Sequence, residues 1–479
     1  MQVNPGIFRG YDLRGLVDVD LNVTVAEHLG KAFGTYLQRN GISQAVVGYD
    51  SRATSPEYSD ALIAGLSWAG VDVINIGLNL VGTFYWSQHY LQHRGGVYVS
   101  ASHNPPEFNG FKFANDYSET LVSEGMQEML RLVQAEDYTQ GATPGKVEVQ
   151  DIRPAYIADI LSRLSVDRKL RVVVDPSCTT AGSIAPQLLR QAGCEVFEYN
   201  TNVDSSFPLG VADPTEVDVL ERLSREVLES GADVGFTYDA DGDRIGIVDE
   251  KGGLIWNDVL VALFAEAVLQ KHPGSTIMYN TFCSRTVAET ITARGGTPFM
   301  WRTGHSFLKK KNQEVKAAFI GELSGHFFFS KDFYNHDDGL YSTMSLLSYL
   351  SRSGSTLSQL VAALPHYVSS PEIKLGCADD KKVALVQKLS PILRQDFPGA
   401  TVIDDERAGD GVRLETADDM FVVRYSQNGP YLGVKFESRT PEGYEKLRQY
   451  LYDLLHTFPE IDWDAKIQAN TAALAEPSV

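Results

Sequence analysis

Residues 99–113, VSASHNPPEFNGFKF, bring together side chains that could carry out covalent chemistry. The segment leaves an apolar strand and breaks at once into small and polar residues, and its two adjacent prolines exclude a continuing helix or central strand. Ser102 and His103 are therefore predicted to lie on a loop at the carboxyl end of a strand, where open α/β sheets bind ligands. Lys112 is predicted to return toward them after a turn at Asn109–Gly110. A serine beside a histidine and a lysine could serve covalent chemistry on an anion.

Three aspartates at alternating positions, Asp239, Asp241 and Asp243, follow a second predicted strand. Like charges this close together are unfavourable unless a cation offsets them, and carboxylate oxygens suit Mg²⁺ or Ca²⁺. An EF-hand is excluded, because Arg244 stands where its sharp turn requires glycine and because both flanks are strand-like. A solvated acidic turn is the alternative, which the apolar strands on both sides disfavour.

A further polar loop, RYSQNGP at residues 424–430, lies between two predicted strands near the end of the chain. A simple hairpin is one interpretation, because Asn428–Gly429 is typical of a hairpin turn. The other interpretation is a phosphate cradle, in which the guanidinium of Arg424 acts together with hydroxyl, amide and backbone donors.

The elements that position these loops follow one plan that is repeated three times. Strands alternate with helices, which indicates βαβ units and mostly parallel sheets. The first helix is predicted to begin with a capping box formed by Thr24 and Glu27. In each repeat the third strand leads directly into a polar loop, at residues 102–105, 239–244 and 321–326. Three loops at one structural position are expected to converge in one cleft.

Composition limits the possible functions. A chain of 479 residues is expected to form three or four domains. The net charge of −20, from 42 basic and 62 acidic residues, argues against general binding to nucleic acid or anionic membranes, so cations must be concentrated locally. The sequence shows no membrane-length apolar run and no signal-like N-terminus. Four scattered cysteines without metal-ligand spacing indicate free thiols in a reducing cytoplasm.

The motifs together resemble those of the α-D-phosphohexomutase superfamily, the phosphoglucomutases and phosphomannomutases. Residues 99–113 are similar to its phosphoserine loop, and residues 239–244 resemble its metal loop Asp-Gly-Asp-Gly-Asp-Arg, with Ala240 for the first glycine. The segment GELSGH at 321–326 resembles Gly-Glu-Met-Ser-Gly-His, which typifies the bacterial-type dual phosphomannomutase/phosphoglucomutase branch. Residues 424–430 are similar to the family's Arg-x-Ser-Asn-Thr-x-Pro loop but differ at Gln427 and Asn428.

The resemblance implies an α/β fold with three topologically similar domains of mixed sheets and a fourth, smaller α+β domain around a central active-site cleft. Domain I would span residues 1–147 and carry the phosphoserine loop. Domain II would span 148–253 with the metal loop, and domain III would span 254–368 with the sugar-binding loop. Domain IV would span 369–479 and contain the phosphate-binding loop and the C-terminal tail.

The activity implied is that of a phosphohexomutase, which interconverts hexose 1-phosphate and hexose 6-phosphate of mannose, glucose or both. A phosphoserine enzyme would act through a hexose 1,6-bisphosphate, which is both intermediate and activator. Mg²⁺ would be bound by Ser102, Asp239, Asp241 and Asp243. The resemblance assigns catalytic roles to Ser102, His103, Lys112, Arg244 and His326. It assigns substrate binding to Tyr11, Arg14, Arg302, Gly304, His305, Glu322, Ser324, Arg424, Ser426 and Asn428.

Several alternatives remain open. A serine hydrolase is disfavoured because no Gly-x-Ser-x-Gly elbow surrounds Ser102. A phosphoglucosamine mutase is disfavoured by Glu322, since that branch typically carries glutamine before the serine. A non-catalytic sugar-phosphate-binding homologue is suggested by Phe282, where dual-specificity members commonly have a phosphate-contacting lysine. The expected partners are small sugar phosphates, with neither nucleic acid nor membrane, and the chain would be a cytoplasmic monomer or weak homo-oligomer. Residues 309–311, three lysines, are interpreted as a solvated helix face.

Overall fold

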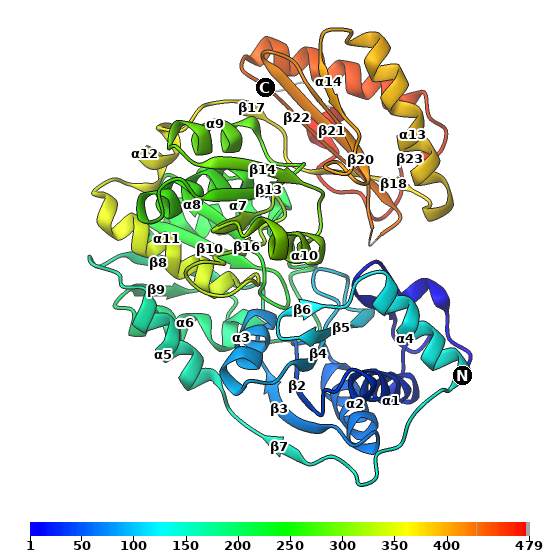
Figure 1. The fold of residues 1–479 in the computed structure, drawn as a ribbon. Helices are drawn as coiled ribbons and strands as arrows, with labels where there is room; N and C mark the ends of the chain where they lie inside the picture. The colour runs from blue at the N-terminus through cyan, green and yellow to red at the C-terminus, as the bar shows by residue number, and fades with distance from the viewer. Residues whose placement is uncertain (428, 476–479) are drawn as a thin grey trace. The chain divides into compact units, whose positions relative to one another are not determined.

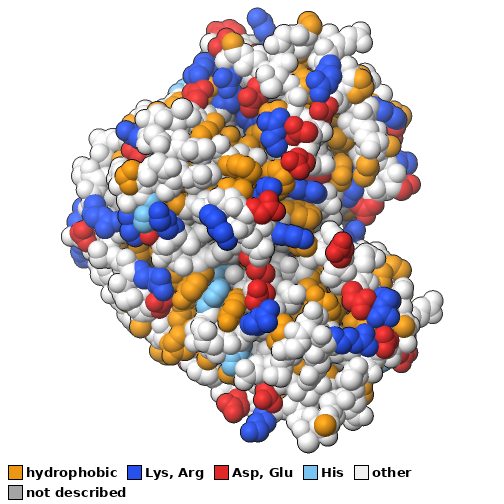
Figure 2. Space-filling model, viewed as in Figure 1, with side chains coloured by type: hydrophobic (Ala, Val, Ile, Leu, Met, Phe, Trp, Pro, Cys, Tyr) orange, Lys and Arg blue, Asp and Glu red, His pale blue; other side chains and the backbone are white. Residues whose placement is uncertain are grey.

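The computed structural model describes residues 1–427 and 429–475 (Figure 1). The chain separates into two compact units. The first unit comprises Met1–Pro214, Arg222–Gly253 and Phe333–Gly354, and the second comprises Thr215–Glu221, Leu254–Asp332 and Ser355–Val479. Within the described residues, we find no helix with the length and apolar character needed to cross a membrane. On the face of the molecule drawn in Figure 2, acidic and basic side chains lie intermixed.

The first unit contains both helices and strands. Its elements are η1 (Pro5–Ile7), β1 (Leu13–Leu16), α1 (Val23–Arg39), β2 (Gln44–Tyr49), α2 (Ser55–Trp68), β3 (Asp72–Leu78), α3 (Val81–Leu91), β4 (Gly95–Val99), β5 (Phe108–Asp116), β6 (Glu119–Thr120), α4 (Glu124–Ala135), β7 (Val147–Val149), α5 (Arg153–Arg163), β8 (Arg171–Asp175), η2 (Thr180–Ser183), α6 (Ala185–Gln191), β9 (Glu195–Glu198), β10 (Val234–Tyr238), β11 (Ile245–Asp249) and α11 (Gly339–Ser353). Helix α7 (Val217–Ser230) contains residues of both units.

The second unit contains the remaining elements. They are β12 (Leu254–Ile255), α8 (Asn257–Lys271), β13 (Thr276–Asn280), α9 (Arg285–Ala293), β14 (Thr297–Trp301), α10 (His305–Val315), β15 (Phe319–Gly321), β16 (Phe327–Phe328), α12 (Leu357–Ala362), β17 (Val368–Ser369), β18 (Ile373–Cys377), α13 (Asp379–Asp396), β19 (Thr401–Ile403), β20 (Gly411–Glu415), β21 (Asp419–Tyr425), β22 (Tyr431–Ser438), α14 (Pro441–His456), β23 (Ile461–Asp462) and α15 (Ala472–Ala475).

Three sheets share one strand order, as the repeat in the sequence predicts. The orders are β5-β4-β2-β3, β11-β10-β8-β9 and β16-β15-β13-β14. In each sheet the last three strands are parallel, and the first strand runs antiparallel to the second. The three polar loops are therefore the equivalent connections β4–β5, β10–β11 and β15–β16. A polar loop at one topological position in each sheet is what a repeated unit requires.

The fourth sheet is built differently, with strand order β19-β20-β21-β22-β18-β23 and antiparallel pairing throughout. Successive residues of β21 point to opposite faces. Phe421 and Val423 belong to the core that contains buried leucines of α13 and α14, whereas Met420 and Val422 pack with Phe282 and Leu323. Both helices thus cover one face of this sheet (Figure 1). This arrangement confirms the predicted α+β character of the C-terminal region.

Helices α1 and α2 lie side by side on the first sheet (Figure 1). A Cβ atom at Gly30 would lie 2.2 Å from the carbonyl oxygen of Leu62, so glycine permits this close crossing. The capping box predicted at Thr24 and Glu27 is wrong, because α1 begins after Asn22, whose side chain accepts a hydrogen bond from the amide of Val25. An asparagine side chain serves this purpose as well as a threonine.

The turn predicted at Asn109–Gly110 is also wrong, because both residues lie within β5. The reversal occurs earlier, in the loop that contains the two prolines. Asn109 is buried and donates hydrogen bonds to the hydroxyls of Thr54 and Ser55 at the start of α2. A Cβ atom at Gly110 would lie 2.2 Å from the carbonyl oxygen of Leu13 in the neighbouring strand β1. Tertiary contacts, rather than a local turn, explain this residue pair.

Asp338 gives the first unit a testable pH dependence. Its buried carboxylate caps α11 by accepting a hydrogen bond from the amide of Tyr341 and also accepts one from the hydroxyl of Tyr156. Burial raises the pKa of Asp338 to about 7. A carboxyl with a raised folded-state pKa contributes stability at low pH, and that contribution is lost as the pH rises through about 7.

We therefore expect wild-type protein to lose roughly 3–4 kcal/mol of unfolding free energy between pH 4 and pH 8, relative to Asp338→Asn, whose side chain is neutral throughout. Thermal unfolding of both proteins across this pH range measures the difference. A difference in midpoint temperature that stays constant with pH would contradict the assignment.

Candidate active site

Ser102 lies directly after β4, on the loop that leads to β5, and its side chain is buried. Its hydroxyl donates a hydrogen bond to Oδ2 of Asp239 at 2.7 Å, and Nδ1 of His103 lies 3.3 Å from the same hydroxyl. The amide of Ser102 donates to the hydroxyl of Ser100, which in turn donates to Oδ2 of Asp241. The predicted nucleophile is thus held against the predicted metal loop, within one compact unit.

The acidic cluster consists of Asp239, Asp241 and Asp243, which are all buried on the β10–β11 connection. One carboxylate oxygen from each lies within 4.8 Å of the others, a spacing that could hold a metal ion. The loop turns at Gly242, whose φ of +71° favours glycine. Ala240 does not adopt a positive φ, so alanine for the family's first glycine leaves the loop conformation accessible.

Two buried cations neutralise this cluster. The ammonium of Lys112 lies 2.9 Å from Asp241 and 2.8 Å from Asp243, and the Nε of Arg244 lies 3.0 Å from Asp239. Burial and the carboxylate of Asp243 raise the pKa of Asp239 well above its usual range. Burial also opposes ionisation of Asp241, but Lys112 outweighs it and lowers the pKa of that carboxyl. Burial and mutual repulsion therefore oppose ionisation of these carboxyls, and the neighbouring cations favour it.

The donor set fits a divalent cation. The Oδ1 atom of Asp241 is buried and has no hydrogen-bond partner among the described residues. A buried carboxylate oxygen without a partner is unfavourable in a protein interior unless a cation or another polar group satisfies it. Three convergent carboxylates provide the hard oxygen ligands that Mg²⁺ or Ca²⁺ prefers.

Arg14, on strand β1, supports the segment that carries Ser102, residues 99–113, which we call the serine loop. Its Nη1 donates to Oδ1 of Asn104 at 2.7 Å, and its Nε is paired with Asp12 at 2.9 Å. Tyr11, which the resemblance places near the substrate, is buried in the same unit. The sequence interpretation named Arg14 and Tyr11 but missed Asp12 and Asn104, which orient the guanidinium.

The second unit contains the predicted sugar-binding residues. Glu322 follows β15, and its Oε2 accepts hydrogen bonds from the amide of Gly304 and from the side chain of Asn280. The rings of His305 and His326 stack with their centroids 5.1 Å apart. The structure therefore brings Glu322, Gly304, His305 and His326 together at the carboxyl ends of β14 and β15.

Two other predicted side chains lie near the same strand ends. Ser324, in the β15–β16 connection, is half-buried, and the guanidinium of Arg302 lies over the ring of Phe307. The prediction that residues 309–311 form a solvated face is wrong for Lys309, which is fully buried on α10.

Arg424, at the end of β21, is oriented by a buried partner that sequence inspection missed. The carboxylate of Asp410 accepts hydrogen bonds from both Nε and Nη2 of Arg424. The guanidinium also lies over the ring of Phe282, 5.5 Å from its centroid. Ser426 accepts a hydrogen bond from the amide of Gly429. The remaining predicted residue of this loop, Asn428, lies outside the described residues.

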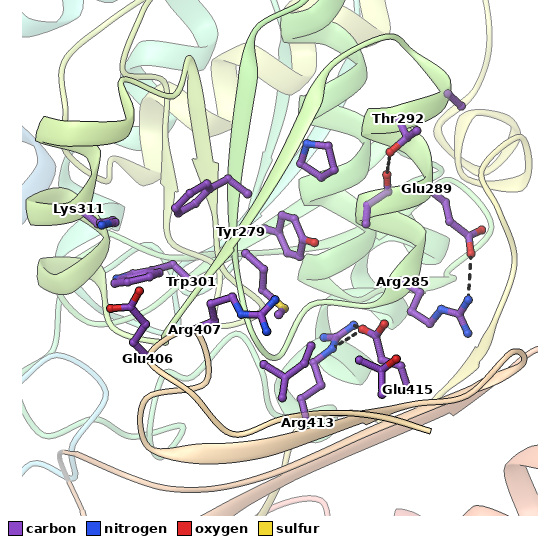
Figure 3. A pocket seen from close by; sticks show the side chains of 17 residues that line it. Tyr279, Arg285, Glu289, Thr292, Trp301, Lys311, Glu406, Arg407, Arg413 and Glu415 are labelled. Carbon is purple, nitrogen blue, oxygen red and sulfur yellow. Dashed lines mark hydrogen bonds and ion pairs between the residues drawn. The ribbon is translucent and has the colours of Figure 1, made fainter. Parts of the chain in front are cut away.

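The second unit also contains a cavity of about 1060 Å³ that is distinct from these groups (Figure 3). It is lined by residues of β13, β14, α9 and β20, with Tyr279 and Trp301 on one side and Arg407 and Arg413 on the other. Among the described residues that line it, none belongs to the predicted site. Arg413 is paired with Glu415.

Comparisons with known proteins show the family to which this chain belongs. Family models described as phosphoglucomutase/phosphomannomutase α/β/α domains I, II and III match residues 5–140, 154–253 and 256–367. The phosphomannomutase/phosphoglucomutase of Pseudomonas putida is 36% identical over 456 residues, which cover 95% of this chain and 96% of the relative. The chain belongs to the phosphoglucomutase/phosphomannomutase family. A phosphoglucomutase of Neisseria gonorrhoeae is 31% identical over 458 residues, 95% of this chain and 98% of its own length.

Solved structures agree with this membership. A phosphoglucomutase/phosphomannomutase family protein from Burkholderia thailandensis superposes with a TM-score of 0.86 at 32% identity, covering 96% of this chain and 99% of that chain. A protein described as a putative phosphomannomutase from Thermus thermophilus, at 19% identity and a TM-score of 0.78, shares the fold; 95% of this chain and 100% of that chain are covered. Membership in the phosphoglucomutase/phosphomannomutase family confirms the predicted superfamily, the fold of three α/β domains and a further domain, and the enzyme class of phosphotransferase mutase. The predicted domain limits and residue roles stay predictions.

Proposed function

We propose that this phosphohexomutase interconverts the 1- and 6-phosphates of mannose, glucose or both, with Ser102 as the phosphoryl carrier. One observation carries this proposal: the hydroxyl of Ser102 lies 2.7 Å from Asp239, beside two further buried carboxylates. A serine that alternates between its free and phosphorylated forms needs cations close by, and Lys112 and Arg244 supply two of them.

The chemistry follows from these positions. In the forward direction, the free hydroxyl of the sugar attacks the phosphorus on Ser102, the bond from phosphorus to Oγ breaks, and a hexose 1,6-bisphosphate forms. His103, 3.3 Å from that Oγ, is placed to exchange a proton with it. The positive charges of Lys112 and Arg244 stabilise the negative charge that moves between the two oxygens. Mg²⁺ bound by Asp239, Asp241 and Asp243 would add charge neutralisation and polarise the phosphoryl group.

The second half of the reaction requires the bisphosphate to turn around and return its other phosphate to Ser102. The phosphate that does not react then needs a separate binding site. Arg424 is suited to this role because Asp410 accepts hydrogen bonds from two of its nitrogens and so fixes the plane of the guanidinium. Glu322 and Ser324 are suited to bind the sugar hydroxyls in either orientation. We assign proton transfer to His326 and contacts with the sugar phosphate to Tyr11, Arg14, Arg302, Gly304 and His305.

A coupled assay with glucose 1-phosphate and mannose 1-phosphate tests this function. We expect turnover of either or both sugars by protein phosphorylated on Ser102 in the presence of Mg²⁺. The absence of turnover under these conditions would favour the non-catalytic binder. Preferential turnover of glucosamine 1-phosphate would favour the phosphoglucosamine mutase. We also assign the reaction to the cytoplasm, because all four cysteines are free thiols.

Arg424→Lys tests the binding of the second phosphate. Lysine keeps the charge but loses the planar fork that Asp410 orients, so we expect KM for the hexose phosphate to rise about 10- to 100-fold. Phosphorylation of Ser102 by the bisphosphate should still occur. Arg394→Lys is the control, because Nη2 of Arg394 also donates to both carboxylate oxygens of an aspartate, Asp404, but on the exposed surface of α13. An unchanged KM in Arg424→Lys would contradict the assignment.

A further inference from the structure

Arg52 is a buried arginine on the short connection from β2 to α2, and no motif in the sequence marks it. All five of its N–H donors form hydrogen bonds. Nε donates to the carboxylate of Asp50. The other four donate to backbone carbonyl oxygens of the serine loop: Nη2 to Ser102 at 2.5 Å and Asn104 at 2.6 Å, Nη1 to Pro105 at 2.8 Å and Phe108 at 2.9 Å.

The arrangement is specific to a guanidinium. Only the planar fork of arginine offers five donors in fixed directions, and no other side chain could bind four carbonyl oxygens at once. Asp50 orients the fork, because its carboxylate also accepts hydrogen bonds from the amide of Arg52 and from the hydroxyl of Ser55. The guanidinium also lies over the ring of Phe207, 5.1 Å from its centroid. The side chain is therefore fixed on every side before any substrate binds.

The loop that Arg52 holds needs such support. Ser102 has a φ of +47°, a backbone conformation that is unfavourable for residues other than glycine by about 1–3 kcal/mol. Such conformations persist only when surrounding contacts impose them. One of the four carbonyl groups that Arg52 binds belongs to Ser102 itself. A change in that contact would rotate the peptide of Ser102 and displace its hydroxyl from Asp239.

We propose that Arg52 is a positioning residue for phosphoryl transfer, which clamps the backbone of the serine loop so that the Ser102 hydroxyl faces the acidic cluster. This inference rests on the proposed role of Ser102 as phosphoryl carrier. Arg52 acts through the backbone and does not touch the phosphoryl group.

Arg52→Lys tests the proposal, since lysine keeps the charge but supplies three donors on a flexible stem. We expect kcat to fall about 100-fold, because a displacement of about 1 Å in a reacting group has that effect, while KM changes by less than about threefold. Hydrogen exchange of backbone amides in residues 100–110 should become faster. Arg448→Lys is the matched control, because Arg448 is also buried and donates to a backbone carbonyl, that of Leu474 in the second unit.

Two results would overturn the proposal: a kcat close to that of wild type, or a lower kcat with unchanged hydrogen exchange in the loop. If Arg52→Lys does not fold, we would measure kcat of Arg52→Ala with and without added guanidinium. The proposal predicts that guanidinium, but not ammonium, restores kcat. No restoration would contradict the clamp. Ser102→Ala separates this proposal from the function itself: full activity in that variant would refute the phosphoserine mechanism, whereas a normal kcat in Arg52→Lys refutes only the clamp.

Discussion

Replacing Ser102 with alanine is expected to reduce kcat by at least about 10⁴-fold, because no other group can take over a covalent carrier. The hydroxyl of Ser102 lies against Asp239, whereas its neighbour Ser100 serves the backbone of Ser102 and Asp241. The variant should still fold, since the substitution removes only one buried hydroxyl. A coupled mutase assay and thermal unfolding measure the two effects.

Ser100→Ala is the control that distinguishes the carrier from a supporting hydroxyl. Its loss leaves the amide of Ser102 without its acceptor and removes one of the two contacts of Oδ2 of Asp241, which still pairs with Lys112, so kcat should fall moderately. Intact-mass analysis after incubation with glucose 1,6-bisphosphate should show one added phosphoryl group on Ser100→Ala and none on Ser102→Ala. Phosphorylation of Ser102→Ala to the wild-type level would assign the carrier to another residue.

The second large effect is expected for Asp241→Asn. Asp241 accepts from Ser100, pairs with Lys112 and has one buried oxygen without a partner among the described residues. Loss of its charge should weaken Mg²⁺ binding about 10- to 100-fold and lower kcat about 10²- to 10³-fold, even at saturating Mg²⁺. Titration calorimetry with Mg²⁺ measures the affinity, and chelation should abolish wild-type activity reversibly.

Asp249→Asn is the matched control for this substitution. Asp249 is a buried aspartate at the opposite end of β11, where its carboxylate accepts hydrogen bonds from the amides of Lys251 and Gly253. An asparagine can make similar contacts there, so Mg²⁺ affinity should stay at the wild-type value. Equal loss of affinity in both variants would show that Asp241 supports the fold rather than the metal.

Much of the architecture could be predicted because its signals are local. Alternating strands and helices, and polar loops that follow apolar strands, appear directly in the sequence. They place Ser102 and Asp239 at equivalent positions in two repeats of one plan. The structure brings these two residues into contact within its first unit.

The contacts that orient the site could not be predicted in this way. Arg52 binds a backbone carbonyl 50 residues away in the sequence, Asp410 binds an arginine 14 residues away, and neither lies in a recognisable pattern. The local signals at Asn109–Gly110 and at Thr24 were misleading. Asn109 donates to buried hydroxyls at the start of α2 instead of forming a turn, and Asn22 rather than Thr24 caps α1. A side chain that hydrogen-bonds a distant backbone leaves no periodic trace in the sequence. Such residues become visible only once the fold is known.

The most direct test of the account follows the phosphate on Ser102 through one turnover. Enzyme phosphorylated with glucose 1,6-bisphosphate and freed of excess sugar is mixed rapidly with glucose 1-phosphate or mannose 1-phosphate in Mg²⁺, and the peptide that contains Ser102 is analysed by mass spectrometry. The account predicts that the phosphoryl group leaves Ser102 at least as fast as kcat and appears in a hexose 1,6-bisphosphate. A Ser102 phosphate that stays in place while the sugar turns over would contradict it.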